Sequence, residues 1–216
     1  RNVELGNEEI KGIMTCKSKK IDIQSKLMGR FNLENIVLAA AISFELNIPE
    51  KSIEKGIKNC SSIDGRMHIV ENLGDYKILL DYGHTPDAYF KALEAVKEKY
   101  KLPIKVLFGA GGGRDHSKRS KMAEAVEKYS LECYLAPDNP RYESIDAINA
   151  DVIKGFSNNN YHCFDDREKA LKFALSNLLT NEILIIFGKG NEEYQEIEGV
   201  KYFYSDKKII KKFYAH

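Results

Sequence analysis

The chain has 216 residues and a mass of 24.6 kDa, which is enough for one large or two small domains with a hydrophobic core. Its 33 basic and 32 acidic residues leave a net charge of +1, and this balance argues against nucleic acid or an anionic membrane as a partner. No segment approaches the about 20 consecutive apolar residues of a membrane span. The four cysteines are far apart and form no C-x-x-C pair, which argues against zinc and favours reduced, buried thiols, so a cytoplasmic protein is expected.

Residues 1–62 are predicted to form the end of one domain. Short alternating apolar patterns within residues 1–28 indicate two or three strands. Residues 31–46 are apolar and rich in alanine at helical spacing, and Pro49 favours a second helix that ends at about Cys60. Because residues 61–66 have the composition of a linker, the domain boundary is placed near residue 63, with a second domain over residues 63–216.

Strands and helices alternate along residues 63–216. Two short strands, 67–72 and 76–81, are expected to form a hairpin around Gly74-Asp75. Further strands are predicted near 104–108, 131–135, 161–164 and 183–187, helices near 86–99, 118–129, 143–156 and 166–179, and finally a strand at 199–204 and a lysine-rich helix. Thr85, and Asp165 paired with Glu168, are the expected N-caps of two helices. This order predicts an α/β fold with a mostly parallel sheet and helices on both faces.

A glycine-rich segment follows the predicted strand at 104–108. Residues 109–113 read Gly-Ala-Gly-Gly-Gly, and three cations, Arg114, Lys118 and Arg119, come soon after them. Backbone N–H groups, a helix N-terminus and cationic side chains together suit phosphate or carboxylate. A tight turn without a ligand is the alternative, and the segment does not match the P-loop pattern G-x-x-x-x-G-K-[ST].

Short polar runs also follow three other strands. Asp138-Asn139-Pro140-Arg141 can pair with both the ammonium and the carboxylate of an amino acid, although a type I turn around Pro140 is the alternative. The glycines of residues 188–192 let a ligand approach the backbone where Glu192 can accept an amine, and a plain strand-to-loop connection is the alternative. His84, within the run 81–87, is equally compatible with a turn histidine bonded to a neighbour. Because parallel strands end at one edge of a sheet, these runs predict one ligand site.

Six motifs then give the chain its resemblance to a known family: GRFNLENIVLAAA (29–41), DGRM (64–67), DYGHTPD (81–87), FGAGGGRDHSKR (108–119), DNPR (138–141) and GKGNEEYQ (188–195). The chain resembles the C-terminal half of a Mur ligase of the UDP-N-acetylmuramoyl-tripeptide synthetase type. The resemblance implies that residues 1–62 end a central ATP-binding domain and that residues 63–216 form a Rossmann-like C-terminal domain. It also implies that the UDP-sugar-binding domain, the P-loop and a carbamylated lysine that holds magnesium lie in a missing part of the polypeptide. This chain alone would then be inactive.

The reaction implied by the resemblance is ATP-dependent amide formation in peptidoglycan precursor synthesis. ATP phosphorylates the terminal carboxylate of UDP-N-acetylmuramoyl-L-alanyl-D-glutamate, and the amine of a diamino acid attacks the resulting acyl phosphate. The expected cofactors are ATP and Mg2+, with the Mg2+ ligands mainly in the missing part, so no metal ligand is assigned in this sequence. The expected partners are the two substrates and the missing N-terminal and ATPase domains.

Motif matching implies three groups of site residues. Asn32 and Asn35 match contacts with adenine, with helix capping as the alternative for both, and Arg66 and Asp81 match contacts with the nucleotide ribose and neighbouring groups. His84, Lys118 and Arg119 would lie toward the phosphates. The residues that match contacts with meso-diaminopimelate are Arg114, Asp138, Asn139, Arg141, Gly188 and Glu192. Arg141 indicates the substrate class, because lysine lacks the second carboxylate that this arginine would bind.

The sequence departs from the family pattern at two positions, and the departure at Asn191 leaves room for a close analogue of diaminopimelate. Asn191 stands where the family usually has histidine, and Gly113 stands where it has aspartate. Two other functions are alternatives: another amide ligase of the superfamily, forming polyglutamate or cyanophycin, and a non-catalytic module that binds an amino acid or a nucleotide. The DNPR and GKGNE motifs argue against the other amide ligases.

Overall fold

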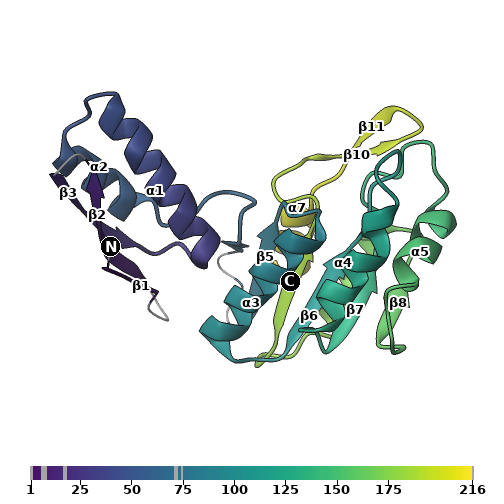
Figure 1. The fold of residues 1–216 in the computed structure, drawn as a ribbon. Coiled ribbons are helices and arrows are strands. Elements are labelled where there is room, and N and C mark those ends of the chain that lie inside the picture. Colours follow the sequence, from purple (N-terminus) through teal and green to yellow (C-terminus); the bar gives the residue numbers. More distant parts are fainter. Residues whose placement is uncertain (1, 6–8, 17–18, 71–72, 74, 216) are drawn as a thin grey trace. The chain divides into compact units, whose positions relative to one another are not determined.

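Figure 1 presents the computed structural model of the chain, which describes residues 2–5, 9–16, 19–70, 73 and 75–215. The chain divides into two compact units, one of residues 1–63 with 94–101 and the other of residues 64–93 with 102–216. The turn expected at Gly74-Asp75 lies partly outside the described residues, because Gly74 is not among them.

The first unit is built on a three-stranded antiparallel sheet. Its elements are β1 (Asn2–Leu5), β2 (Ile10–Cys16), β3 (Lys19–Ser25), α1 (Arg30–Glu45) and α2 (Glu50–Asn59). In β3, buried Ile21 and Ile23 alternate with more exposed neighbours, as expected for a strand with one face on a core. Ile36 of α1 and Ile53 of α2 pack into the same apolar clusters. The strands and both helices predicted for this part of the chain are therefore confirmed.

The second unit is built on a six-stranded sheet in the order β4-β5-β9-β6-β7-β8. The strands are β4 (His68–Ile69), β5 (Lys77–Asp81), β6 (Ile104–Phe108), β7 (Glu132–Leu135), β8 (Tyr161–Cys163) and β9 (Ile183–Phe187). Only the edge strand β4 is antiparallel to its neighbour among these described strands. β6 and β9 are buried along their whole length, which explains their continuous apolar sequences. The predicted α/β fold with a mostly parallel sheet is confirmed.

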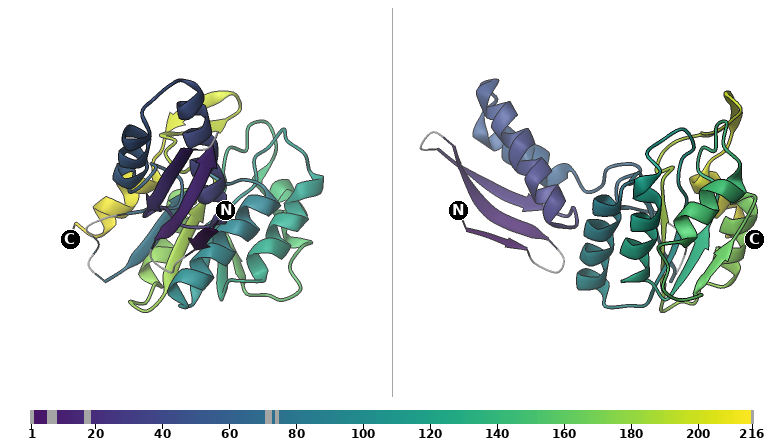
Figure 2. Two further views of the ribbon diagram at one scale, coloured as in Figure 1. Left: turned by 60° about the vertical axis from the view of Figure 1, so that its left-hand side comes forward. Right: turned by 45° about the vertical axis from the view of Figure 1, so that its right-hand side comes forward.

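Helices cover both faces of this sheet (Figures 1 and 2). The first half of α3 (Pro86–Tyr100), together with α4 (Ser117–Glu127) and α5 (Ile145–Ile153), covers one face, and α6 (Arg167–Ser176) and α7 (Asp206–Phe213) cover the other. Connections between parallel strands are right-handed, so the three connections that step the same way along the sheet leave their helices on one face. The connection from β8 to β9 steps back past β7 and β6, which places α6 on the opposite face.

The helix caps agree with the sequence prediction at one helix and differ by one residue at another. Thr85 Oγ1 accepts a hydrogen bond from Ala88 N at 3.3 Å at the start of α3, as predicted. The cap of α6 is Asp166, which accepts from Lys169 N at 2.7 Å, and not Asp165. Asp166 has the extended backbone that an N-cap requires, and the helix starts directly after it.

The C-terminal strand does not join the large sheet. It is β11 (Val200–Phe203), and it pairs with β10 (Tyr194–Ile197) in a separate two-stranded hairpin. The lysine-rich helix that follows is α7, and its Ile209, Ile210 and Phe213 pack into the core, as its pattern predicts.

The expectation of buried cysteine thiols holds for Cys133 but not for Cys163. Cys133 is buried, and burial raises the pKa of its thiol to about 12. Cys163 is exposed at the edge strand β8, so the expectation of buried thiols is wrong for this residue. Within the described ranges, no helix combines the length and the apolar character needed to cross a membrane.

Candidate amino-acid and nucleotide site

Four loops are adjacent at the carboxyl edge of the parallel strands. β5, β9, β6 and β7 are neighbours in that order, so the loops that follow them share one edge. Gly188 N, just after β9, donates to the carbonyl of Asp81 at 3.0 Å, and Gly112 N, after β6, donates to the carbonyl of Asn139 at 2.9 Å. The polar runs identified in the sequence are therefore held against one another by backbone hydrogen bonds.

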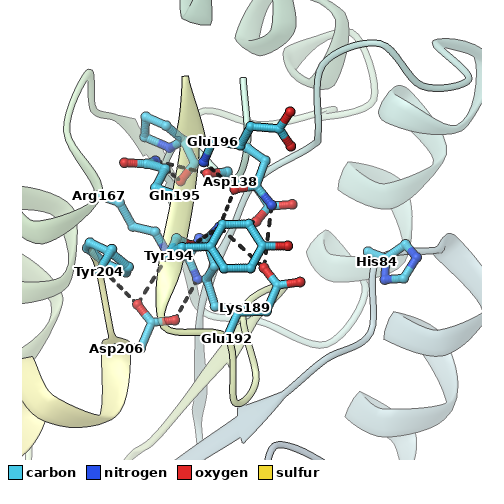
Figure 3. Close-up of polar contacts among 12 residues, drawn as sticks. His84, Asp138, Arg167, Lys189, Glu192, Tyr194, Gln195, Glu196, Tyr204 and Asp206 are labelled. Atoms are coloured by element: carbon cyan, nitrogen blue, oxygen red, sulfur yellow. Dashed lines mark hydrogen bonds and ion pairs between the residues drawn. The ribbon is translucent and has the colours of Figure 1, made fainter. Parts of the chain in front are cut away.

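Lys189 lies at the centre of a polar cluster in these loops (Figure 3). Its side chain is fully buried, and its Nζ donates to Asn139 Oδ1 at 2.5 Å and to the carbonyl of Tyr194 at 2.9 Å. Asp138 Oδ1 and Glu192 Oε2 lie 3.4 and 3.5 Å from the same nitrogen. Burial lowers the pKa of Lys189, and the charges of Asp138 and Glu192 oppose this shift. One lysine thus gathers the acids that the sequence analysis assigned to an amine.

Asn139 connects this cluster to Glu192. The side chain is 5% exposed, and its Nδ2 donates to Glu192 Oε2 at 3.4 Å. The hydroxyl of Tyr82 donates to the other oxygen, Oε1, at 3.2 Å. Both carboxylate oxygens of Glu192 are therefore oriented by neighbouring side chains.

A positive φ of 104° at Gly188 lets the chain turn beside Asp138, whose Cγ would lie 3.5 Å from a Cβ at this glycine.

Arg141 and Arg114 both lie close to Gly111. Arg141 Nη1 donates to the carbonyl of Gly112 at 2.8 Å, and Nε donates to Glu196 Oε2 at 3.2 Å. A Cβ at Gly111 would lie 3.2 Å from Arg141 Nη1 and 3.7 Å from Arg114 Cγ. The same Cβ would lie 3.8 Å from the carbonyl oxygen of Asn139, so Gly111 lies close to Arg141, Arg114 and Asn139.

The glycine-rich loop is shaped by close packing as well as by any ligand. A Cβ at Gly109 would lie 1.9 Å from the carbonyl oxygen of Ala136, and a Cβ at Gly112 would lie 1.9 Å from that of Pro140. Both distances are far below van der Waals contact. These glycines are therefore required for the loop after β6 to pack against the loop after β7.

The residues assigned to the nucleotide ribose lie at the end of β5. The carboxylate of Asp81 accepts hydrogen bonds from Met67 N at 2.9 Å and Gly83 N at 2.7 Å. Burial raises the pKa of Asp81 above its ordinary value, and these two hydrogen bonds oppose the rise. Arg66 is exposed, and its guanidinium lies 4.9 Å from the centre of the Tyr82 ring.

His84 and Lys118 are neighbours on the same side of the sheet edge. His84 is exposed, its Nδ1 lies 3.0 Å from the carbonyl of Tyr82, and its own carbonyl accepts from Lys118 Nζ at 3.3 Å. In Figure 3, His84 lies apart from the cluster around Lys189. The two residues are thus joined by a hydrogen bond, and their expected place toward the phosphates stays a prediction.

Arg119 occupies different surroundings from those expected of a phosphate ligand. It is 1% exposed, and its guanidinium donates to Glu143 Oε2 at 2.9 Å, to Asp151 Oδ2 at 3.1 Å and to the carbonyl of Gly111 at 3.2 Å. The pKa of Asp151 is lowered to about 2 by hydrogen bonds from Lys154, His116 and Arg119. Because Nη1 and Nη2 donate to these oxygens, the terminal nitrogens of Arg119 are bound within the protein, and the bond to the Gly111 carbonyl supports the glycine-rich loop.

Asn32 and Asn35 belong to the first compact unit. Asn32 is 3% exposed, and its Nδ2 donates to the carbonyl of Met28 at 2.8 Å, which secures the start of α1. The N-cap of α1 is Gly29. Asn35 is exposed on the same helix. The bond made by Asn32 favours a role in holding the helix start.

Four charged residues near the site were not assigned a role from the sequence: Lys189, Glu196, Arg167 and Asp206. Lys189 has a signal in the sequence, because it comes two residues after the strongly apolar segment 183–187, and a cation that is buried there needs acidic or polar partners. Glu196 lies outside the motifs quoted above, and only the hairpin geometry brings it to Arg141. Arg167 and Asp206 form a fully buried pair, with Nη2 and Oδ2 2.9 Å apart. Their separation of 39 positions follows no sequence pattern.

The geometry described above agrees with the result of comparing the chain with known protein families. Residues 65–190 match the family described as "Mur ligase, glutamate ligase domain". The chain belongs to the Mur ligase family. This match includes the loops that carry Asp81, Gly111, Arg141 and Gly188.

Curated relatives agree with this assignment. The UDP-N-acetylmuramoyl-L-alanyl-D-glutamate--2,6-diaminopimelate ligase of Caldanaerobacter subterraneus subsp. tengcongensis is 36% identical over 209 residues, covering 95% of this chain and 43% of the relative. The ligase of the same name from Aquifex aeolicus is 36% identical over 196 residues, covering 90% of this chain and 40% of the relative. The chain thus spans about two fifths of the length of these curated relatives.

Solved structures support the fold. A structure of a UDP-N-acetylmuramoyl-L-alanyl-D-glutamate--2,6-diaminopimelate ligase matches with a TM-score of 0.69 and 28% identity, covering 99% of this chain and 44% of that one. A folylpolyglutamate synthase from Mycobacterium tuberculosis also gives a TM-score of 0.69, at 14% identity, covering 87% of this chain and 44% of the other. At that identity the second match supports the fold alone.

Proposed function

We propose that the polypeptide containing this chain is an ATP-dependent ligase that adds meso-diaminopimelate, or a close analogue, to UDP-N-acetylmuramoyl-L-alanyl-D-glutamate in peptidoglycan precursor synthesis. The curated relatives, which carry the name of this reaction, support the proposal. Residues 63–216 would form the domain that binds the amino acid, and residues 1–62 would end the central ATP-binding domain. The protein would act in the cytoplasm.

The observation that carries the proposal is the mixture of charges around Gly111 and Lys189. Three cations, Arg114, Arg141 and Lys189, lie with three acids, Asp138, Glu192 and Glu196, in the loops at the sheet edge. A diamino acid with two carboxylates and two ammonium groups is neutral overall and needs donors and acceptors together. This set of residues is suited to such a ligand better than to a simple cation or anion.

The chemistry assigned to this chain is positioning and charge stabilisation. ATP would supply the phosphoryl group that activates the carboxylate of the UDP-linked dipeptide. Arg66 and Asp81 would hold the nucleotide, and His84 and Lys118 would lie toward its phosphates; the adenine contact of Asn32 and Asn35 rests on motif match alone. Arg114, Arg141, Asp138, Asn139, Gly188 and Glu192 would present the amine of the amino acid to the activated carbonyl.

Magnesium would be bound mainly by other parts of the polypeptide. Within the described part of this chain, no group of three or more His, Cys, Asp and Glu side chains is arranged to hold a metal ion. The acids near the site are instead paired with Lys189 and Arg141. That the Mg2+ ligands lie mainly outside this chain is part of the proposal.

The test is binding and turnover with Arg141→Ala in the natural polypeptide that contains this sequence. Truncating a hydrogen-bonded charged partner costs about 2 to 5 kcal/mol, and the lower end applies here because Arg141 is 23% exposed. Affinity for diaminopimelate in isothermal titration should then fall about 30-fold. Lys121→Ala, at an exposed position of α4, is the control. Unchanged affinity in Arg141→Ala would contradict the proposed amino-acid site, and turnover with glutamate in place of diaminopimelate would favour a polyglutamate-forming relative.

A further inference from the structure

The hairpin β10–β11 is hydrogen-bonded to the loop that carries Arg141. Gln195 Nε2 donates to the carbonyls of Pro137 at 3.2 Å and Asp138 at 2.9 Å, and Glu196 N donates to Asn139 Oδ1 at 2.8 Å. Arg141 N donates to the carbonyl of Glu196 at 3.1 Å. The hairpin therefore makes a hydrogen bond at nearly every residue of the segment 137–141.

The hairpin also forms hydrogen bonds with the backbone of Arg141, which adopts an unfavourable conformation. Its φ is +52°, in the left-handed region that costs an L-residue energy unless neighbouring contacts hold it. Glu198 N donates to the Arg141 carbonyl at 2.7 Å, and Arg141 and Ile197 form an isolated bridge. The hairpin thus supplies bonds on both sides of the strained residue.

Glu196 also fixes the direction of the guanidinium. Its Oε2 lies 3.2 Å from Arg141 Nε, and the carbonyl of Gly112 accepts from Nη1 at 2.8 Å. A guanidinium has five N–H donors, and it can bind a carboxylate through the Nε edge or through the Nη1 and Nη2 edge. Since Glu196 accepts from Nε and the Gly112 carbonyl takes one hydrogen of Nη1, the second hydrogen of Nη1 and the two hydrogens of Nη2 are left for a ligand. Among the described residues, no oxygen accepts from Nη2.

We propose that Glu196 is a positioning residue of the amino-acid site, which holds Arg141 by Nε so that its Nη edge faces the carboxylate of the bound amino acid. The inference rests on the proposed function, because it takes Arg141 as a ligand of the amino acid. Glu196 acts through Arg141 and the hairpin, and it lies outside the set of residues that the motifs assign to the substrate. The two side chains are each 23% exposed, so the pair borders solvent and a ligand can reach it.

The experiment compares Glu196→Ala and Glu196→Gln in the natural polypeptide that contains this sequence. With Glu196→Ala, the Arg141 guanidinium is no longer held in one orientation, and we expect the KM for diaminopimelate to rise by about 3-fold to 30-fold, the upper end being the loss expected when Arg141 itself is removed. The KM for ATP should stay within about twofold, because the hairpin makes no bond to Arg66 or Asp81 in the described residues. Glu196→Gln keeps an oxygen acceptor for Nε, so its KM for diaminopimelate should stay close to that of the unmodified protein.

The control is Glu193→Ala in the same segment. Glu193 pairs with Lys208 at 3.0 Å, and its side chain is 56% exposed, so its loss should leave both KM values unchanged. The inference is overturned if Glu196→Ala leaves the KM for diaminopimelate unchanged, if both KM values rise in parallel, or if Glu196→Gln behaves like Glu196→Ala. If instead the unmodified protein does not use diaminopimelate at all, the proposed function fails, and the two failures are distinguished.

Discussion

Replacing Asp206 with alanine should destabilise the second unit more than replacing an exposed acid that also lies in the first turn of a helix. Arg167 and Asp206 are both completely buried, and two hydrogen bonds join them, Nε to Oδ1 at 3.1 Å and Nη2 to Oδ2 at 2.9 Å. Burial disfavours the charge of Arg167, but Asp206 and Tyr204 outweigh this effect and raise the pKa of the guanidinium. Asp206→Ala would leave that charge buried without a carboxylate partner, and the carbonyl of Phe187, which accepts from Nη2 at 2.9 Å, does not neutralise it.

The magnitude follows from what the variant leaves behind. Breaking a buried ion pair costs about 3 to 5 kcal/mol, and the hydroxyl of Tyr204, which donates to Asp206 Oδ1 at 2.7 Å, loses its acceptor at a further cost of about 1 kcal/mol. For a chain of this size, about 4 to 6 kcal/mol lowers the melting temperature by roughly 8 to 24 °C. Urea unfolding and calorimetry would measure both quantities.

A matched control and a double variant separate charge burial from other effects. Asp146 lies in the first turn of α5, as Asp206 does in α7, but it is exposed, so Asp146→Ala should cost only about 0.3 to 1 kcal/mol. Replacing both partners, as in Arg167→Met with Asp206→Leu, should recover most of the lost stability because no unpaired charge remains. Equal costs for Asp206→Ala and Asp146→Ala would refute this reasoning.

Two further predictions concern the loops of the site. Gly112→Ala should lower the free energy of unfolding by about 2 kcal/mol or more, because its Cβ would lie 1.9 Å from the Pro140 carbonyl oxygen. At Gly113 the nearest atom would lie at 3.8 Å and φ is +62°, so Gly113→Ala should cost only about 1 kcal/mol. Urea unfolding measures both, and a larger cost for Gly113→Ala than for Gly112→Ala would contradict the close packing of Gly112 against Pro140. The pKa of Asp81 lies above its ordinary 3.8 mainly because of burial, so between these two values the unfolded state is ionised while the folded state still holds its proton. The free energy of unfolding of the unmodified protein should therefore fall relative to that of Asp81→Asn as pH rises through this window. If the difference between the two free energies stays constant between about pH 3 and pH 7, the pKa of Asp81 is not raised in the folded protein.

Local patterns predicted the elements of this fold well, because each element is determined by neighbours in sequence. Apolar strands, the Thr85 cap and the helical spacing of α7 were all visible without coordinates. The position of β9 between β5 and β6 was not, because strand order depends on packing between distant segments. The separate hairpin β10–β11 was missed for the same reason, and only its second strand was predicted.

The candidate site was predictable to the extent that its residues lie in loops after strands. The adjacency of Asp138, Asn139 and Glu192 follows from the shared sheet edge. Arg119 could not be judged in this way, because it lies close in sequence to Arg114, yet α4 turns its side chain inward toward Glu143. Sequence proximity thus indicated the right loop but could not separate a residue that faces a ligand from one that supports the loop.

The central position of β9 has a consequence for how the chain is made. β9 pairs with β5 on one side and with β6 on the other, although about 75 residues separate it from the end of β6. Until residues 183–187 have been synthesised and have left the ribosome, β5 and β6 lack the strand that lies between them. Each then exposes a row of backbone N–H and C=O groups that have no strand partner. A nascent chain stopped before this point would carry two incomplete half-sheets, and this is the stage at which aggregation during synthesis would be most pronounced.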